Sequence, residues 1–330
     1  MKACEVDYPL PEGAVATPAE AVEPPDDSTP HRDDTSSRAV VMGMVRMARP
    51  RQWIKNLLVF VAPGAAGVLT HGDAFLKALG AFGIFCIAAS GTYFLNDTID
   101  ADRDRLHPTK RYRPVASGVV APRLAIGVGS VLLVLSFGLA WWLAGYRLAL
   151  VVGLYVVITT VYSLWLKHEP IIDLAAVSSG FVLRAIAGGI ATGVVLSDWF
   201  LIVASFGSLL IVTGKRSGEQ KLLGANQAQI RQTLGRYDPS FLQTVRTLSA
   251  AVTVTAYCLW AFDRAVAIHP GHHPIWFQLS IVPFVLGLLH VVRQLDAGKG
   301  STPEDMALGD RRLQIYGITW VALIVVGVYA

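Results

Sequence analysis

A cluster of carboxylates follows directly after an apolar run of membrane-spanning length, in the sequence N-D-T-I-D-A-D-R-D. In a continuing helix, Asp97, Asp100 and Asp104 share one face. Asp102 points elsewhere on the same helix. Three carboxylates and the amide of Asn96 would suit Mg²⁺, which prefers hard oxygen ligands and often binds together with substrate phosphates. The spacing therefore predicts a magnesium and diphosphate site at a membrane surface.

The alternative interpretation of this cluster is a solvated acidic helix end, which charge runs commonly form. Negative side chains are unfavourable at a helix C-terminus, because the helix dipole is also negative there. The metal-binding interpretation is therefore favoured.

The composition is that of a membrane protein. The chain is 53% hydrophobic and 16% charged, with a mean hydropathy of +0.48, which is far from the balance of soluble domains. Its three cysteines, Cys4, Cys86 and Cys258, lack metal-ligand spacing and predict no disulfide framework. No nucleic-acid partner is expected.

Nine apolar segments approach the length of about 20 residues that crosses a bilayer core. Their predicted limits are 54–70, 75–95, 123–145, 148–166, 171–195, 199–214, 247–263, 275–293 and 313–329. The predicted fold is therefore an all-α, polytopic bundle of nine transmembrane helices with an active-site cavity that faces the cytoplasm.

The first 40 residues differ from the remainder of the chain. They carry nine acids against three bases, with scattered prolines and few large apolar side chains. Such a segment cannot bury enough surface to offset chain entropy. We therefore predict a disordered, acidic, Pro-rich cytoplasmic tail over residues 1–44 and a nine-helix domain over residues 45–330.

The basic residues predict the orientation. With a cytoplasmic N-terminus, 21 of the 25 bases beyond residue 40 fall on the cytoplasmic side, as the positive-inside rule requires. The outer side keeps Lys77, Arg147 and Arg264, and Arg184 lies within a span. We expect a multi-pass protein of the cell membrane with a cytoplasmic site and an external C-terminus.

In this topology, the second, fourth and sixth spans end on the cytoplasmic face in ionisable groups. Convergence of separate helix ends makes a site more credible than one motif. Besides the aspartates, the residues predicted there are Tyr162, Lys167, Lys215, Arg216 and Glu219. For Tyr162 the alternative is an aromatic anchor at the membrane interface.

Basic residues follow the aspartates and also occur within the fifth span. Lys110, Arg111 and Arg113 suit phosphate oxygens, although cytoplasmic topology alone would also place bases there. Arg184 is costly in a membrane unless it faces a partner or a polar cavity. Two interpretations stay open for it, substrate phosphate binding and an ion pair with Asp173.

The motif N-D-x-x-D-x-x-x-D, the following R-P-x-x-x-G at 113–118 and nine predicted spans resemble the UbiA-type intramembrane prenyltransferase superfamily. The resemblance implies a cavity open to lipid, and Mg²⁺ and diphosphate bound by Asn96, Asp97, Asp100 and Asp104, the last three being catalytic. The stretch R-P-R-Q-W-I-K-N at 49–56 also carries the resemblance, which adds Lys55 and Asn56 to the substrate-binding residues.

The chain departs from the superfamily after the sixth span, where a second aspartate-rich motif is replaced by G-K-R-S-G-E at 214–219. In this motif the chain resembles the branch of the superfamily that moves a 5-phosphoribosyl group from phosphoribosyl diphosphate to decaprenyl (polyprenyl) phosphate for cell-wall arabinan synthesis. The alternatives are a prenyltransferase with an aromatic or haem acceptor and, more remotely, a transporter. The oligomeric state is left open, and a homo-oligomer is compatible with the sequence.

Overall fold

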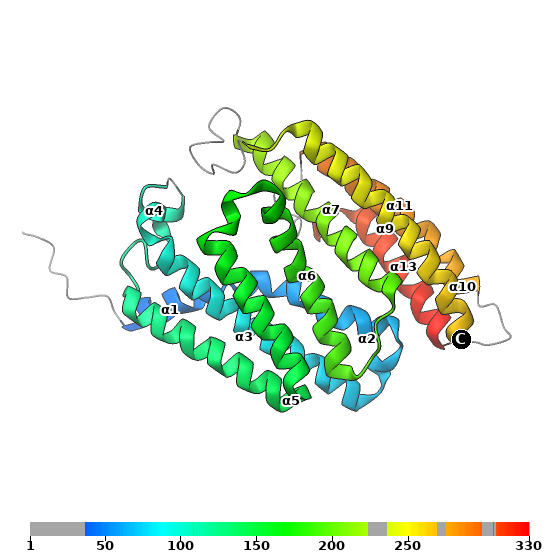
Figure 1. Ribbon diagram of the computed structural model, residues 1–330, viewed down its shortest axis with the longest axis horizontal. Helices are drawn as coiled ribbons and strands as arrows, with labels where there is room; N and C mark the ends of the chain where they lie inside the picture. Colours follow the sequence, from blue (N-terminus) through cyan, green and yellow to red (C-terminus); the bar gives the residue numbers. More distant parts are fainter. Residues whose placement is uncertain are drawn as a thin grey trace, which may run out of the picture.

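The computed structural model describes residues 37–107, 109–223, 236–268, 275–298, 306 and 308–329. All regular secondary structure in these ranges is helical, as predicted. The helices pack side by side into an elongated bundle (Figure 1).

Seven helices of the described part are long and apolar enough to cross a membrane. They comprise α3 (Gly72–Ile99), α5 (Pro122–Leu164), α6 (Pro170–Thr192), α7 (Asp198–Leu223), α9 (Pro239–Ile268), the joined α10 (Ile275–Leu279) and α11 (Ile281–Asp296), and α13 (Arg311–Tyr329).

Helix α5 covers two predicted spans. Non-helical dihedrals interrupt its 43 residues at Ala144 and at Gly145, whose φ of 70° favours glycine. A Cβ added at Gly153 would lie 3.7 Å from the ring of Phe137, although these residues would be about 24 Å apart along a straight helix. The two halves of α5 therefore fold back on each other, as the two separate predicted spans require.

The first predicted span, 54–70, is not one α-helix. It consists of the 3₁₀ helix η1 (Pro50–Phe60), the short α2 (Val61–Ala65) and the 3₁₀ turn η2 (Val68–Thr70). Pro63 lacks the N–H that would bond to the carbonyl of Val59 in an α-helix, and this carbonyl instead lies against Gly188 of α6. At about 2.0 Å per residue in η1 and about 1.5 Å in α2, the segment still extends roughly 30 Å.

The predicted tail boundary at residue 44 is wrong, because α1 already begins at Ser37 and continues to Ala48. Met47 is fully buried and packs with Phe94 and Val120, whereas Val41 on another face of α1 is exposed. This pattern suits a helix that lies along a membrane interface. The prediction of disorder for residues 1–36 lies outside the described residues.

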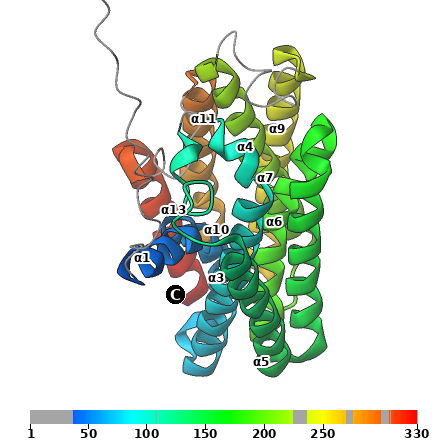
Figure 2. The same cartoon turned by 90° about the vertical axis from the view of Figure 1, so that its left-hand side faces the viewer.

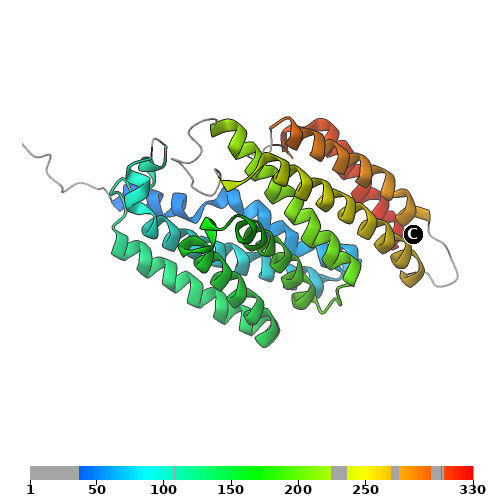
Figure 3. The same cartoon turned by 45° about the horizontal axis from the view of Figure 1, so that its top comes forward.

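One end of the bundle carries the predicted aspartates, and the C-terminal helix packs against the other end. Figure 2 shows the short helix α4 (Ala101–Arg105), which follows α3, at the same end as the tops of α7, α9 and α11. At the opposite end, the hydroxyl of Tyr329 donates to the carbonyl of Gly67 at 2.7 Å. The blue N-terminal segment runs along the bundle between these ends (Figure 3).

The approach of η1 to α6 generates a prediction. A Cβ at Gly188 would lie 1.8 Å from the carbonyl oxygen of Val59, so Gly188→Ala must push η1 away from α6. Overpacking of this kind lowers the free energy of unfolding by about 1–3 kcal/mol. We expect a clearly lower midpoint of thermal unfolding in detergent.

The matched control is Gly83→Ala on α3, where an added Cβ would meet nothing within 4 Å. This change should cost little, since alanine favours helix over glycine. Equal unfolding midpoints for the two variants would contradict the close approach.

Candidate active site

Two of the predicted metal ligands, Asp97 and Asp104, are buried and share one guanidinium. Arg113 Nη1 donates to Asp97 Oδ1 at 3.2 Å and to Asp104 Oδ2 at 2.7 Å. Arg49 Nη2 donates to the same oxygen of Asp97 at 2.5 Å, and its guanidinium lies 4.6 Å from the ring centre of Tyr93. The carboxylates of Asp97 and Asp104 therefore point into one space, which the guanidinium groups of Arg49 and Arg113 also reach.

The predicted shared face is confirmed for Asp97 and Asp104, which bond to one guanidinium, although α3 ends at Ile99 and α4 starts at Ala101. Helical hydrogen bonds continue through the break, because Asp100 N donates to the carbonyl of Asn96 and Asp104 N donates to that of Asp100. Asp102 points outward, with 92% of its side chain exposed.

Asp100 connects the aspartates to the end of the fourth predicted span. Lys167 belongs to the 3₁₀ turn η4 (Leu166–His168) that follows α5. Its Nζ donates to Asp100 Oδ1 at 3.1 Å. Two separate helix ends therefore meet at this carboxylate, as the sequence predicts.

The loop after α4 returns Arg113 to the aspartates. Arg105 Nε donates to the carbonyl of Ala116 at 3.3 Å, which fixes the return of the chain. Earlier in the loop, burial and then nearby Lys110 lower the pKa of His107. Neutral His107 accepts backbone N–H bonds from Thr109 and Lys110 through Nδ1, so it serves as a turn cap.

A second buried cluster joins α6 and α7. Arg216 Nε and Nη2 donate to the two oxygens of Asp173 at 2.6 and 2.8 Å, as a fork. Arg216 Nη1 donates to Glu219 Oε2 at 2.9 Å. Asp173 is fully buried and Arg216 is 3% exposed, so each charge supplies the partner that the other requires.

Two tyrosines complete this cluster. The hydroxyl of Tyr162 donates to Asp173 Oδ1 at 2.8 Å and accepts from Arg216 Nη2 at 3.2 Å. Tyr237, just before α9, donates to Asp173 Oδ2 at 2.9 Å. The ends of the fourth and sixth predicted spans therefore converge as expected, and Tyr162 belongs to a polar network in addition to lying at a helix end.

Arg184 does not pair with Asp173, which corrects one of the two interpretations of this residue. Its guanidinium donates to Asn56 Oδ1 at 2.6 Å, to the Gly180 carbonyl at 2.5 Å and to the Tyr155 hydroxyl at 3.1 Å. It also lies 4.8 Å from the ring centre of Tyr155. These contacts fasten η1 to α5 and α6.

The remaining predicted residues lie on η1, on the loop after α4, on α3 and on α7. Lys55 Nζ donates to Gln52 Oε1 at 2.6 Å on η1. Arg111 donates to the hydroxyl of its neighbour Tyr112 and lies on an exposed surface. Asn96 and Lys215 are half-buried on α3 and α7, one position before Asp97 and Arg216 respectively.

The carboxylates fit Mg²⁺ in the chemistry of their donors. Asp97 and Asp104 present oxygens to one space, which is what a cation with oxygen ligands requires. Among the described residues, no group of three acidic, histidine or cysteine side chains lies close enough to hold a metal ion. Cations stand beside the carboxylates instead: Arg49 and Arg113 at Asp97, Arg113 at Asp104 and Lys167 at Asp100.

The model of the UbiA prenyltransferase family matches residues 57–318, and the chain belongs to this family. It is 43% identical over 290 residues to decaprenyl-phosphate phosphoribosyltransferase of Corynebacterium glutamicum, covering 87% of each chain. It is 42% identical over 298 residues to the enzyme of the same name from Mycolicibacterium smegmatis, covering 88% of this chain and 93% of that one.

Solved structures share the fold at low sequence identity. A UbiA homologue from Archaeoglobus fulgidus, bound to GPP and Mg²⁺, superposes with a TM-score of 0.64 at 18% identity, covering 87% of this chain and all of the other. A structure of digeranylgeranylglyceryl phosphate synthase gives a TM-score of 0.62 at 15% identity, covering 87% of this chain and 98% of that one.

No site role was predicted from the sequence for Arg49 or Tyr237, and one of the two interpretations of Arg184 gave the wrong partner to Asp173. The signal for Asp173 was present, because a carboxylate within an apolar span needs a partner. Arg49 stands out only in the structure, where it has a left-handed φ of 50°, which is unusual for a residue other than glycine. The sequence around Tyr237 contains no comparable signal.

The buried fork predicts the effect of Asp173→Asn. Removing one partner of a buried pair costs about 3–5 kcal/mol, because the other charge remains buried. We expect a large loss of thermal stability in detergent.

Asp73→Asn is the control. Asp73 pairs with Lys77 at 2.8 Å, but its side chain is 80% exposed, and exposed pairs contribute little. A variant of Asp173 as stable as this control would show that Arg216 does not depend on the carboxylate.

Proposed function

We propose that the protein transfers a 5-phosphoribosyl group from phosphoribosyl diphosphate to a polyprenyl phosphate such as decaprenyl phosphate, releasing diphosphate. The observation that carries this proposal is the 43% identity, over most of both chains, to an enzyme named for that transfer. The polar end of the bundle supports it with a set of side chains suited to phosphorylated substrates.

In this proposal Asp97, Asp100 and Asp104 hold the metal, with Asn96 beside them. When bound there, Mg²⁺ would neutralise charge on the leaving diphosphate. The adjacent cations have donors suited to phosphate oxygens. Arg49, Arg113 and Lys167 contact the carboxylates directly, so we infer that they exchange these contacts for phosphate oxygens when the substrate binds.

The transfer forms a bond between an oxygen of the acceptor phosphate and C1 of the ribose while the bond from C1 to the diphosphate oxygen breaks. The acceptor phosphate is an anion at neutral pH, so no side chain has to remove a proton from it. The residues therefore act by holding two anions close together and by stabilising charge on the leaving group.

The end of α7 supports phosphoribosyl transfer over transfer of a prenyl group to an aromatic acceptor. Arg216 is engaged with Asp173 and Glu219, so the carboxylates of this cluster are neutralised internally and offer little to a second metal. We infer that Lys167 and Lys215 supply positive charge for the 5-phosphate and the acceptor phosphate, with Lys55, Lys110 and Arg111 as further cations for phosphate oxygens.

We propose a topology of nine crossings with a cytoplasmic N-terminus and an external C-terminus. The seven long helices, the reversal within α5 and the roughly 30 Å extent of η1 with α2 are together consistent with this number. The polyprenyl chain would then stay in the bilayer while the aspartates meet phosphoribosyl diphosphate from the cytoplasm.

The activity is tested by incubating purified protein in detergent with Mg²⁺, labelled phosphoribosyl diphosphate and decaprenyl phosphate. We expect label in the extracted lipid and its loss on chelation. Asp97→Asn should lower the rate at least about 100-fold, in line with removal of an electrostatic group from a reaction centre.

The control is Asp102→Asn, which removes an exposed carboxylate of the same motif and should leave the rate unchanged. Full activity of the Asp97 variant would remove the metal-binding role. Transfer of a prenyl group to an aromatic acceptor, with none to polyprenyl phosphate, would replace the proposed reaction.

Lys167→Ala tests the contact between Asp100 and the end of α5. Hydrogen bonds to charged groups contribute about 1.5–3 kcal/mol, so kcat/KM for phosphoribosyl diphosphate should fall roughly 10- to 100-fold.

Arg103→Ala removes an exposed cation of α4 that has no part in the site, and we expect near-normal kinetics. If the two variants behaved alike, Lys167 would have no specific part in substrate binding.

A further inference from the structure

A small cavity lies at the end of the bundle remote from the aspartates. Its volume is about 140 Å³, and it is formed by the end of α2, the connection from α6 to α7, and α9. The side chains that characterise it are Ala66, Val195, Leu196, Phe200, Trp260 and Arg264. The walls are therefore mainly apolar, and the charged groups among them are the guanidinium of Arg264 and the carboxylate of Asp263.

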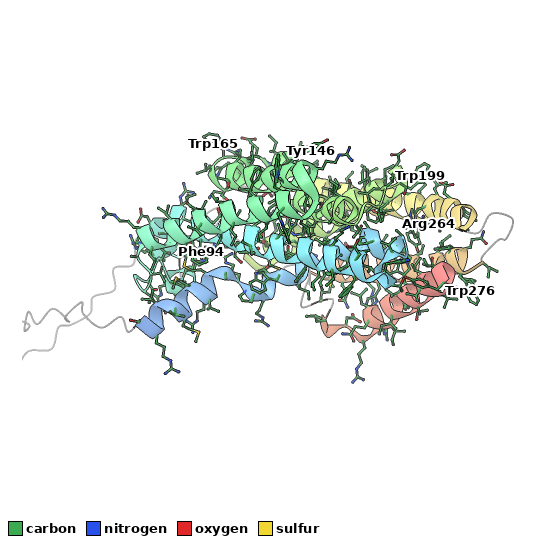
Figure 4. The ribbon with its side chains drawn as sticks, turned by 90° about the horizontal axis from the view of Figure 1, so that it is seen from below. Phe94, Tyr146, Trp165, Trp199, Arg264 and Trp276 are labelled. Carbon is green, nitrogen blue, oxygen red and sulfur yellow. The ribbon has the colours of Figure 1, made fainter. Side chains whose placement is uncertain are left out.

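The cavity is distinct from the active site. Helix α9 starts beside Tyr237, which contacts Asp173, and Arg264 follows Pro239 by about 37 Å at 1.5 Å per residue. In Figure 4, Arg264 and Trp199 lie far from Phe94, which belongs to the half of α3 that leads to the aspartates.

The cation of the cavity has a donor that no described residue satisfies. Arg264 Nε is buried and meets no hydrogen-bond acceptor in the part of the chain that the structure describes. The neighbouring carboxylate of Asp263 accepts instead from Trp199 Nε1 at 2.6 Å. Lys77 and Arg147 differ from Arg264, since Lys77 donates to a carboxylate oxygen of Asp73 and Arg147 Nε donates to the hydroxyl of Tyr146.

An anion in the cavity would compensate this guanidinium. A buried donor without an acceptor is unfavourable, and a guanidinium matches the oxygens of a phosphate. The adjacent carboxylate of Asp263 leaves this donor unsatisfied, because it accepts from the indole of Trp199.

The size and surroundings of the cavity restrict the ligand. Pockets that enclose a whole small molecule measure about 300–1,000 Å³, so a volume of about 140 Å³ admits a phosphate headgroup but not a complete lipid. Val195 at the cavity is 93% exposed. This apolar side chain offers a surface for acyl chains outside the cavity.

We propose that this cavity binds the phosphate of a membrane phospholipid, with Arg264 as the phosphate ligand and the acyl chains lying over the exposed apolar rim. The site is independent of phosphoribosyl transfer and would anchor the bundle to the leaflet opposite the aspartates. Arg264 belongs to no part of the proposed reaction.

The test uses the full chain in mild detergent, titrated with dioleoyl phosphatidylglycerol while the midpoint of thermal unfolding is followed. A ligand that binds the folded state raises this midpoint in a saturable way. Dioleoylglycerol, which lacks the phosphate, should give no saturable rise. Arg264→Gln should require about tenfold more phosphatidylglycerol for the same rise.

Arg147→Gln is the matched control, because it removes an exposed arginine from the same end of the bundle, and it should titrate like the unaltered protein. Arg264→Lys keeps the charge and should retain most of the response, even if the glutamine variant folds poorly. An unchanged titration for Arg264→Gln would overturn the proposal, as would an equal rise with inorganic phosphate alone, which would assign the cavity to a free anion.

Discussion

Charges inside an apolar bundle must be compensated, and this constraint organises the polar end of the molecule. Asp173 is fully buried, and Arg216, Tyr162 and Tyr237 donate to its two oxygens. Because these donors come from α7, from the end of α5 and from the residues before α9, one carboxylate holds the ends of three elements against α6. Taking charges out of water is costly unless geometry and hydrogen bonds repay it, so this end is well defined.

The aspartates of the candidate active site obey the same constraint in a different way. Asp97 and Asp104 are compensated by Arg49 and Arg113, which keep 30% and 28% of their side chains exposed. The cations that meet Asp97 can therefore move toward a substrate at low cost, whereas Arg216 at 4% exposure cannot. This difference separates groups suited to phosphate binding from groups that maintain the fold.

The 3₁₀ segment η1 shows how packing supports the site. Such helices are usually short, but here 11 residues keep this form because Val59 lies against Gly188 and Asn56 bonds to Arg184. These contacts hold the segment in place just after Arg49, which reaches Asp97. In this member of the UbiA prenyltransferase family, an irregular segment thus positions Arg49 beside the carboxylate of Asp97.

The sequence by itself determined the membrane class, the apolar segments that became long helices, and the face shared by Asp97 and Asp104, since hydropathy and helical periodicity are local properties. The tertiary structure alone decided that Asp173 pairs with Arg216 and not with Arg184, and that the first segment is 3₁₀. These outcomes depend on contacts between residues far apart in the chain, such as Arg184 with Asn56. No local pattern encodes which of several buried charges will meet, because that choice follows from how the helices pack.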